Sequence, residues 1–316
     1  MNRVISVIIC TRNHADSLRE TLLAIGKVAV PLGWEVEIVV ADNGSTDQTK
    51  VVVEETLVPN MSVKRVVEPV TGQSRARNLG LNASSGEIIV FTDDDVRPSA
   101  CWLTKLCEPL IAGTADGVQG GVFLPPSRRF SWMKRLHFEL FASTEFFTPG
   151  EVKSMWGANF AFRREALACV PAFDIELGPG ALGFADDSLF SIQLREAGNR
   201  LIYVPEAAVE HWFDCSRLTM ASLRSRAFRD GQSRAYVDYH WEHQSADGSK
   251  DKLQSAKRAI LRHYVKRPWR LMPNSVLNEA EFWLQIGAGY WTQMEVEKHR
   301  PRRYAKRGLR LLEQET

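Results

Sequence analysis

The chain has 316 residues, of which 44% are hydrophobic and 25% are charged, as is ordinary for a folded protein with a sizeable core. No run of 18 apolar residues occurs, which excludes a membrane-spanning helix. The net charge of +2 is unevenly distributed. Residues 250–316 carry 15 Lys and Arg against 7 Asp and Glu, whereas the first 249 residues carry 25 Lys and Arg against 31 Asp and Glu. The basic tail therefore predicts an anionic surface as its partner.

Short β-rich runs alternate with helical segments through the first half of the chain. We predict strands at 4–10, 36–41, 63–67 and 87–92, separated by helices of about ten to fourteen residues. This spacing is typical of βα units with a parallel sheet. In such sheets ligands gather beyond the carboxyl ends of the strands, where the polar sequences TRNHAD, DNGSTD and TDDD lie.

The pattern is more mixed from residue 117 to residue 209, where we predict a strand at 158–162 and a helix from about Asp187. No linker interrupts it. We therefore predict one α/β domain over residues 1–215, with a mixed, mainly parallel sheet flanked by helices.

Residues 216–316 predict a helical, basic C-terminal region. Arg258, Arg262 and Lys266 recur at every fourth position beside apolar residues, which indicates an amphipathic helix with a cationic face. Two roles stay open for the tail through residues 250–316. It contacts an anionic inner membrane leaflet, or it is a solvated helix packed on the catalytic domain.

Three adjacent carboxylates, Asp93, Asp94 and Asp95, follow the apolar strand EIIVF. Such groups repel one another, so a fold that places them at a strand end normally neutralises them with a cation. Hard oxygen ligands favour Mg²⁺ or Mn²⁺, which keep substrate phosphate oxygens as further ligands. The alternative is a solvated acidic turn that caps the next helix.

Two further clusters suit a nucleotide. Asp42 ends a strand, where its carboxylate accepts hydrogen bonds from a base or ribose, or else forms only an Asx turn. Arg75 and Arg77 lie in the first turns of a predicted helix, but their i, i+2 spacing places them on different faces. We expect at most one of them to reach a phosphate, and the other to form a structural ion pair.

Asp186 and Asp187 follow a Gly-rich loop and begin a helix. A carboxylate at this place can take a proton from an incoming hydroxyl, although helix capping claims one of the two. His211 follows a strand, and a lone histidine is more often a packing residue than a ligand.

The five cysteines, an odd number without C-x-x-C spacing, predict buried free thiols in a reducing compartment. The apolar run at 4–10 is not followed by a small-residue cleavage site and is interpreted as a buried strand. We expect a cytoplasmic protein. In one of the two roles open to its tail, the protein also contacts the inner face of the membrane peripherally.

In this order, TRN, ADNGSTD, SRARNLG, TDDDVRP, WGANFAFRREAL, GFADDS and EHW resemble the family 2 glycosyltransferases of the GT-A fold. The resemblance covers about residues 5–212. It implies an inverting transfer from a nucleotide-diphosphate sugar, usually UDP-linked, with a divalent metal, Mg²⁺ or Mn²⁺, at the diphosphate. Its acceptor is a glycan or lipid-linked saccharide, in polysaccharide or glycoconjugate biosynthesis.

The resemblance also implies roles for particular residues. The positions that match donor-binding residues are Thr11 and Arg12 in the nucleotide pocket, Asp42 at the base or ribose, Arg75 at the pyrophosphate, Asp93 and Asp94 in the acidic motif, and Trp156 and Asn159 at the donor sugar or the acceptor. Asp95 matches the metal-binding carboxylate, and His211 matches an additional metal ligand of some members. Asp187 matches the catalytic base. Because Asp186 replaces the commoner Glu, the division of labour between Asp186 and Asp187 stays open.

The Q-x-x-R-W motif of the processive synthases is absent, so a single-addition enzyme is favoured. Two alternatives remain. A nucleotidyltransferase that makes nucleotide sugars would carry a G-x-G-T-R loop after its first strand, where this chain has TRNHAD. A non-catalytic protein that binds nucleotide sugars would not need the acidic pair. Nucleic-acid binding is not favoured, because the tail lacks an interleaved aromatic platform.

Overall fold

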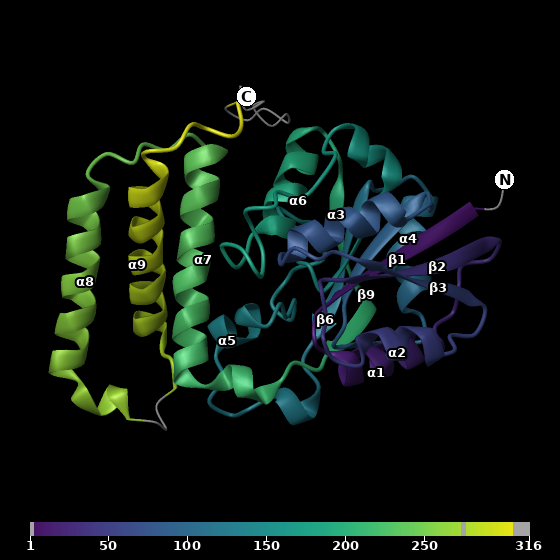
Figure 1. Cartoon of the computed structure of the whole chain (residues 1–316), viewed down its shortest axis with the longest axis horizontal. Coiled ribbons are helices and arrows are strands. Elements are labelled where there is room, and N and C mark those ends of the chain that lie inside the picture. The colour runs from purple at the N-terminus through teal and green to yellow at the C-terminus, as the bar shows by residue number, and fades with distance from the viewer. Residues whose placement is uncertain (1–2, 273–275, 306–316) are drawn as a thin grey trace. The chain divides into compact units, whose positions relative to one another are not determined.

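A computed structural model describes residues 3–272 and 276–305 of the chain. The chain forms two compact units. The first, here called the sheet unit, comprises Met1–Ile175 and Asp186–Phe213. The second, here called the helical unit, comprises Glu176–Ala185 and Asp214–Thr316. The chain therefore passes from the sheet unit to the helical unit, returns for one helix and one strand, and leaves again (Figure 1).

The described part of the sheet unit contains one nine-stranded sheet in the order β3-β2-β1-β4-β8-β6-β9-β5, with β7 beside β9. Its strands are β1 (Arg3–Thr11), β2 (Trp34–Asp42), β3 (Met61–Val67), β4 (Ile88–Asp93), β5 (Val96–Pro98), β6 (Gly117–Phe123), β7 (Gly150–Glu151), β8 (Asn159–Arg163) and β9 (Leu201–His211). The predicted strands of the first half are all present. β1 to β4 pair in parallel, and β6 is parallel to β9. β8 runs antiparallel between β4 and β6, so the sheet is mixed.

Both faces of the central strands are covered, as their continuous apolar sequences require. Ile5, Val7 and Ile9 belong to the core on the side of α1 and α4, whereas Phe91 of β4 stacks on Phe160 of β8 at 5.2 Å on the other. Figure 1 shows α1 and α2 on one side of the sheet and α3 and α6 on the other. The helices of this unit are α1 (Ala15–Ile25), α2 (Thr49–Glu55), α3 (Gln73–Ala83), α4 (Trp102–Ile111), α5 (Arg135–Leu140) and α6 (Asp186–Glu196), with 3₁₀ turns η1 (Pro126–Arg128) and η2 (Arg164–Ala168).

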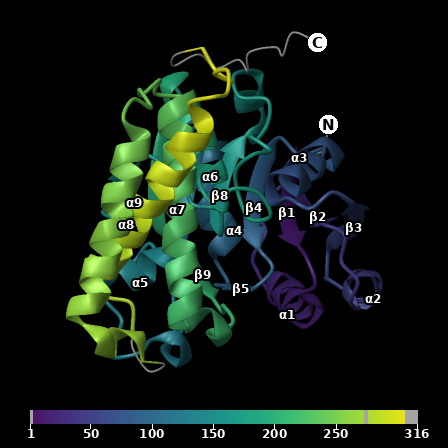
Figure 2. The same cartoon turned by 60° about the vertical axis from the view of Figure 1, so that its left-hand side comes forward.

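The helical unit contains η3 (Cys215–Leu218), α7 (Met220–His240), α8 (Ser249–Lys266), η4 (Pro268–Leu271) and α9 (Glu279–Glu297). Helix α9 lies between α7 and α8 (Figures 1 and 2). Two glycines allow α7 and α9 to approach closely: a Cβ on Gly231 would overlap the backbone of Ile286, and one on Gly289 would overlap that of Phe228. Within the described residues, none of these helices is both long and apolar enough to cross a membrane.

The environment of the cysteines differs from the prediction. Cys107 is buried in the core, but three of the five thiols are exposed: Cys101, Cys169 and Cys215. Each exposed cysteine lies at the boundary of an element, where apolar neighbours in sequence do not become neighbours in space. The prediction of uniformly buried thiols is therefore wrong.

Candidate active site

The acidic triplet lies where β4 ends beside the last residue of β9. Val96 pairs with His211 across the sheet, which brings His211 to the carboxylates. Asp95 Oδ1 lies 3.2 Å from His211 Nε2, and both side chains are buried. One oxygen each of Asp93 and Asp95 and one ring nitrogen of His211 all lie within 4.8 Å of one another.

The tautomer of His211 follows from its other contact. Its Nδ1 lies 2.7 Å from the carbonyl oxygen of Phe141, which can only accept, so Nδ1 carries a proton. The neutral ring then presents the lone pair of Nε2 to Asp95, and only a proton or a metal ion makes that approach favourable. Burial, together with the charge of Asp95, raises the pKa of Asp93 to about 6. These residues therefore fit a divalent cation with oxygen and imidazole ligands.

Asp94 is held differently from its two neighbours. It accepts hydrogen bonds from Thr11 Oγ1 at 2.6 Å and contacts His14 Nδ1 at 2.9 Å. Burial raises its pKa, which the hydrogen bond from His14 opposes. Asp94 thus links the end of β4 to the end of β1. The hydroxyl proton of Thr11 is donated in this hydrogen bond. A second group of possible ligands, His14, Asp94 and Asp95, also lies within 4.8 Å.

Asp42 is fully buried and strongly bound within the protein. Its Oδ2 accepts hydrogen bonds from Arg65 at 2.5 and 2.8 Å, and its Oδ1 accepts one from the Ser45 amide at 2.8 Å. A base or ribose would have to share these acceptor oxygens. Neighbouring Arg12, by contrast, is exposed and donates to Thr71 Oγ1 at 2.6 Å.

The two arginines of α3 have separate environments. Arg77 is buried, forms an ion pair with Asp186, and stacks over Phe173 at 5.3 Å. Its interactions with Asp186 and Asp187 raise its pKa against the opposing effect of burial. Arg75 is half-buried, and no partner in hydrogen bonding or ion pairing is found for it among residues 3–272 and 276–305. Arg77 is therefore the ion-pair residue, and Arg75 keeps its guanidinium available for a ligand.

Asp186 and Asp187 begin α6 but differ in their partners. Asp186 is neutralised by Arg77, and Ser74 Oγ lies 3.5 Å from it. The carboxylate of Asp187 instead accepts backbone N–H bonds from Gly157 and from Ser188, the latter at 2.6 Å. Burial, together with the charge of Asp186, raises the pKa of Asp187 to about 6.

Trp156 and Asn159 flank the start of β8. Trp156 is half-exposed, and its ring meets that of Phe147 edge to face at 4.6 Å. Asn159 is buried, and its amide binds Trp102 Nε1 and the carbonyls of Gly121 and Ala207 at 2.8 to 2.9 Å. Both N–H groups of Asn159 are thus used to hold neighbouring strands together, and they are not free for a sugar.

Three residues of this site were not singled out from the sequence. Gln119 on β6 accepts a hydrogen bond from the Trp156 amide at 2.5 Å and donates to Asn159 O at 3.0 Å. His14 and Gly157 bind Asp94 and Asp187. Each comes from a segment distant in sequence, so only the paired strands bring them together. A glycine inside WGANF was the one visible hint, since glycine in a strand entry often marks a close approach.

Comparison with known proteins gives consistent matches. The family described as Glycosyl transferase family 2 matches residues 6–170. The succinoglycan biosynthesis protein ExoM of Rhizobium meliloti is 30% identical over 235 residues, which cover 72% of this chain and 73% of that protein. The glucosyl-dolichyl phosphate glucuronosyltransferase of Haloferax volcanii is 23% identical over 310 residues, which cover 90% of this chain and 95% of that protein.

Solved structures share the architecture. The mannosyltransferase PcManGT from Pyrobaculum calidifontis, in complex with GDP-Man and Mn²⁺, superposes with a TM-score of 0.57 at 19% identity, over 93% of this chain and 86% of that one. TarS 1-349 of S. aureus, in complex with UDP-GlcNAc, gives a TM-score of 0.52 at 19% identity, over 93% of this chain and 91% of that one. At this identity the two structures support the fold alone.

Proposed function

Since this chain belongs to glycosyl transferase family 2, we propose that it is a metal-dependent, inverting enzyme that transfers one sugar per encounter from a nucleotide-diphosphate donor. The predicted GT-A fold and the assignment as a glycosyltransferase are confirmed. A UDP-sugar is the proposed donor, and a glycan or lipid-linked saccharide is the proposed acceptor. Polysaccharide or glycoconjugate biosynthesis is the proposed role.

The observation that carries this proposal is the different state of two adjacent carboxylates. The carboxylate of Asp186 is already bound by the guanidinium of Arg77 in a buried ion pair. Asp187 has a pKa of about 6 and is therefore mostly ionised at neutral pH while still basic enough to take a proton. We assign the base role to Asp187 and a positioning role to Asp186.

The donor site is proposed at the carboxyl ends of β1, β2 and β4. Asp93, Asp95 and His211 would hold Mg²⁺ or Mn²⁺. When bound, such a cation neutralises the charge that develops on the leaving diphosphate. Arg75 is the proposed pyrophosphate contact, Arg12 and Trp156 are proposed to line the donor, and Asn159 is proposed to hold the strands rather than to touch the sugar.

The reaction is a single displacement. The acceptor hydroxyl oxygen bonds to the anomeric carbon while the bond from that carbon to the diphosphate oxygen breaks on the opposite face. The hydroxyl proton passes to the carboxylate of Asp187. Gly157 and Ser188 hold that carboxylate by their backbone amides, so it needs no reorientation. One displacement inverts the anomeric configuration.

The alternatives that the sequence left open gain no support. The matched family and the Haloferax volcanii relative are both named for sugar transfer, which disfavours a nucleotidyltransferase or a non-catalytic scaffold. We further propose residues 1–215 as the catalytic domain and 216–316 as a basic helical region. That region would bring the enzyme to the inner face of an anionic membrane from the cytoplasm.

Replacing Asp187 by Asn tests the base assignment. The amide is nearly isosteric but cannot accept the proton, so we expect transfer to fall by about 10²–10⁴-fold. Metal-dependent nucleotide binding, measured by calorimetry with UDP and Mn²⁺, should stay within about threefold. Turnover at the wild-type rate would contradict the assignment. Loss of nucleotide binding as well would show that Asp187 serves the donor.

A further inference from the structure

One stretch of the helical unit has no acidic residue. Between Leu253 and Met272 the chain carries no Asp or Glu but six Lys and Arg: Lys257, Arg258, Arg262, Lys266, Arg267 and Arg270. Arg270 is committed to the buried Glu281 through a bond of 2.5 Å. The other five side chains are exposed on α8 and at its end. The basic tail thus has its charge concentrated on one element.

The same stretch exposes large apolar side chains that the fold leaves in solvent. The exposed fractions are 63% for Leu261, 70% for Val265, 56% for Trp269, 60% for Leu271 and 62% for Met272. Single exposed apolar residues are common, but five within twelve positions, on α8 and in the turn after it, are a concentration that favours an interaction surface. We call these five residues, with Lys257, Arg258, Arg262, Lys266 and Arg267, the α8 edge.

The helix period shows which face of α8 carries its exposed apolar side chains. Leu253, Ile260 and Tyr264 are half-buried on the face of α8 that packs toward α9. Leu261 and Val265 lie on the other face, one turn apart, with Arg258 and Arg262 beside them at i−3. Figure 2 shows α8 as an outer helix of this unit, with α9 between it and α7. Within the part of the chain that the structure describes, no element covers this face.

The charge identifies the partner. A second copy docked through the same face would place ten cations against one another with no carboxylate between them, which disfavours self-association. An anionic lipid surface supplies the complementary charge, attracts Lys and Arg, and accepts Leu, Val and Met at the boundary of headgroups and acyl chains. Tryptophan favours this boundary, and Trp269 is the aromatic residue of the edge.

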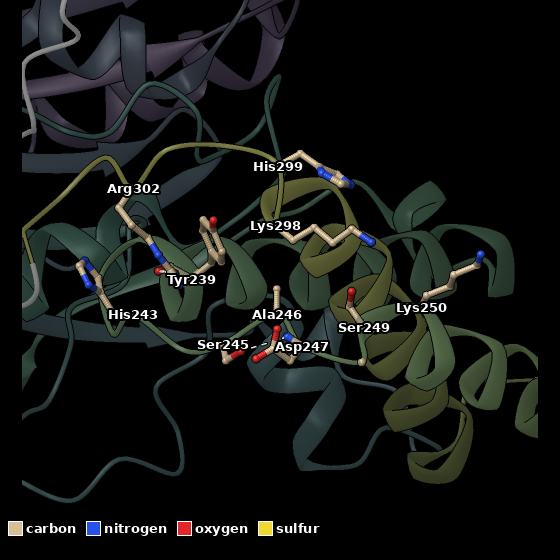
Figure 3. A pocket seen from close by; sticks show the side chains of 11 residues that line it. Tyr239, His243, Ser245, Ala246, Asp247, Ser249, Lys250, Lys298, His299 and Arg302 are labelled. Atoms are coloured by element: carbon tan, nitrogen blue, oxygen red, sulfur yellow. Dashed lines mark hydrogen bonds between the residues drawn. The ribbon is translucent and has the colours of Figure 1, made fainter.

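We propose that the α8 edge is a membrane-binding surface, which lies in the headgroup region of an anionic bilayer. The inference rests on the proposed function, in which residues 250–316 contact a membrane. It assigns that contact to one helix, α8, and the turn after it. The pocket of about 560 Å³ at the other end of α8, lined by Asp247, Lys250, Lys298 and His299 among others (Figure 3), is not part of it. There Lys298 already pairs with Glu295 and Arg302 with backbone carbonyls.

Vesicle flotation tests the proposal with the full-length protein. We expect wild type to float with vesicles of 30% phosphatidylglycerol in phosphatidylcholine at low salt, and to stay in solution with phosphatidylcholine alone. The double variant Arg258→Glu with Arg262→Glu should bind at least tenfold more weakly. Leu261→Ser with Val265→Ser should also reduce binding at least tenfold, although it leaves the charge unchanged.

Two controls separate this surface from general charge and from catalysis. Arg19→Glu with Lys27→Glu makes the same charge change at exposed positions of the sheet unit and should bind as wild type does. Asp187→Asn should float as wild type does, because binding needs no turnover. Equal flotation of all variants, or no flotation of wild type, would overturn the proposal. Apolar-dependent dimers in light scattering would assign the surface to self-association instead.

Discussion

At the scale of single residues, the site shows how environment separates two identical side chains. Asp186 and Asp187 are adjacent in sequence and both lie in the first turn of α6. Arg77, a cation close to both carboxylates, packs against Phe91 and Phe173 and forms its ion pair with Asp186. The hydrogen bonds to Asp187 come instead from the amides of Gly157 and Ser188 and from the Ser188 hydroxyl, while the nearby charge of Arg77 works against the rise of its pKa. This environment suits the proposed role of general base.

The pKa of Asp187 gives a prediction for the pH dependence of transfer. A base acts in its ionised form, and the pKa of Asp187 is raised to about 6. We therefore expect kcat/KM to be constant above pH 7 and to fall about tenfold per pH unit below pH 6. A profile of kcat/KM from pH 4.5 to 8.5 checks this. A rate that stays flat down to pH 4.5 would remove Asp187 from the proton transfer.

Changing the neighbour tests the cause of that shift. The charge of Asp186 raises the pKa of Asp187, so Asp186→Asn should move the acid limb of the profile to lower pH. The same change leaves buried Arg77 without its carboxylate and should lower stability by about 3–5 kcal/mol. Urea unfolding measures this loss and shows whether the variant is folded during the assay. An acid limb that does not move would assign the shift to burial alone.

Gly157 lies where a side chain cannot fit. A Cβ at this position would overlap the guanidinium of Arg77 and lie 3.0 Å from Asp187 Oδ2. We expect Gly157→Ala to displace both groups and to lower kcat by at least tenfold, with the fold retained. Gly287→Ala is the matched control, because that helical position has no atom within 4 Å. It should raise stability by about 0.5–1 kcal/mol and leave kcat unchanged.

At the scale of elements, the segment before the candidate base is held by the helical unit. Glu176, at its start, binds Arg300 at 2.7 Å and Arg303 at 2.5 Å. Toward its end the Phe184 amide donates to Ser233 Oγ on α7 at 3.1 Å. The next residue, Ala185, has a φ of +68°, a left-handed conformation that is costly for alanine. One peptide bond later the chain reaches Asp186.

Releasing this segment should slow transfer without touching the donor site. Burial works to raise the pKa of Glu176, but the bonds to Arg300 and Arg303 outweigh it, so the pKa is lowered and the group is ionised at neutral pH. We expect Glu176→Gln to lower kcat several-fold, to leave KM for the donor unchanged, and to speed amide exchange within 176–185. Exposed Glu279→Gln makes the same charge change as a control. A variant with faster exchange but normal kcat would separate the segment from catalysis.

The elements that the sequence predicted correctly share one property. The strands of the first half and the helix at 249–266 have uninterrupted local patterns, so their formation depends little on the rest of the chain. The strand predicted at 158–162 is also present as β8, but its antiparallel direction depends on which strand lies next to which, and the exposure of the thiols depends on tertiary packing. The pairing of Arg77 with Asp186, across 109 residues of sequence, likewise follows from tertiary packing that no local pattern records.

At the scale of the whole molecule, acidic and basic residues are concentrated in different parts of the chain. The first 249 residues have an excess of acidic groups, and a cluster of these carboxylates converges at the end of β4. The mutual repulsion of these carboxylates opposes folding, and a cation with an anionic diphosphate would relieve it. The excess of basic groups lies in the tail, where the α8 edge faces solvent. Donor binding should therefore be visible in the stability of the protein as a whole.

Thermal unfolding measures this linkage. A ligand that binds only the folded state, at 100 times its Kd, stabilises by about 2.7 kcal/mol, which is a rise in Tm of roughly 5–10 °C for a domain of this size. We expect UDP-sugars with Mn²⁺ to produce this rise and the same nucleotides with EDTA to produce little. Asp95→Asn, which lacks one proposed metal ligand, should abolish the rise, whereas Asp187→Asn should keep it. A rise that persists in EDTA and in Asp95→Asn would show that the nucleotide is held without the metal, by groups such as Arg75 alone.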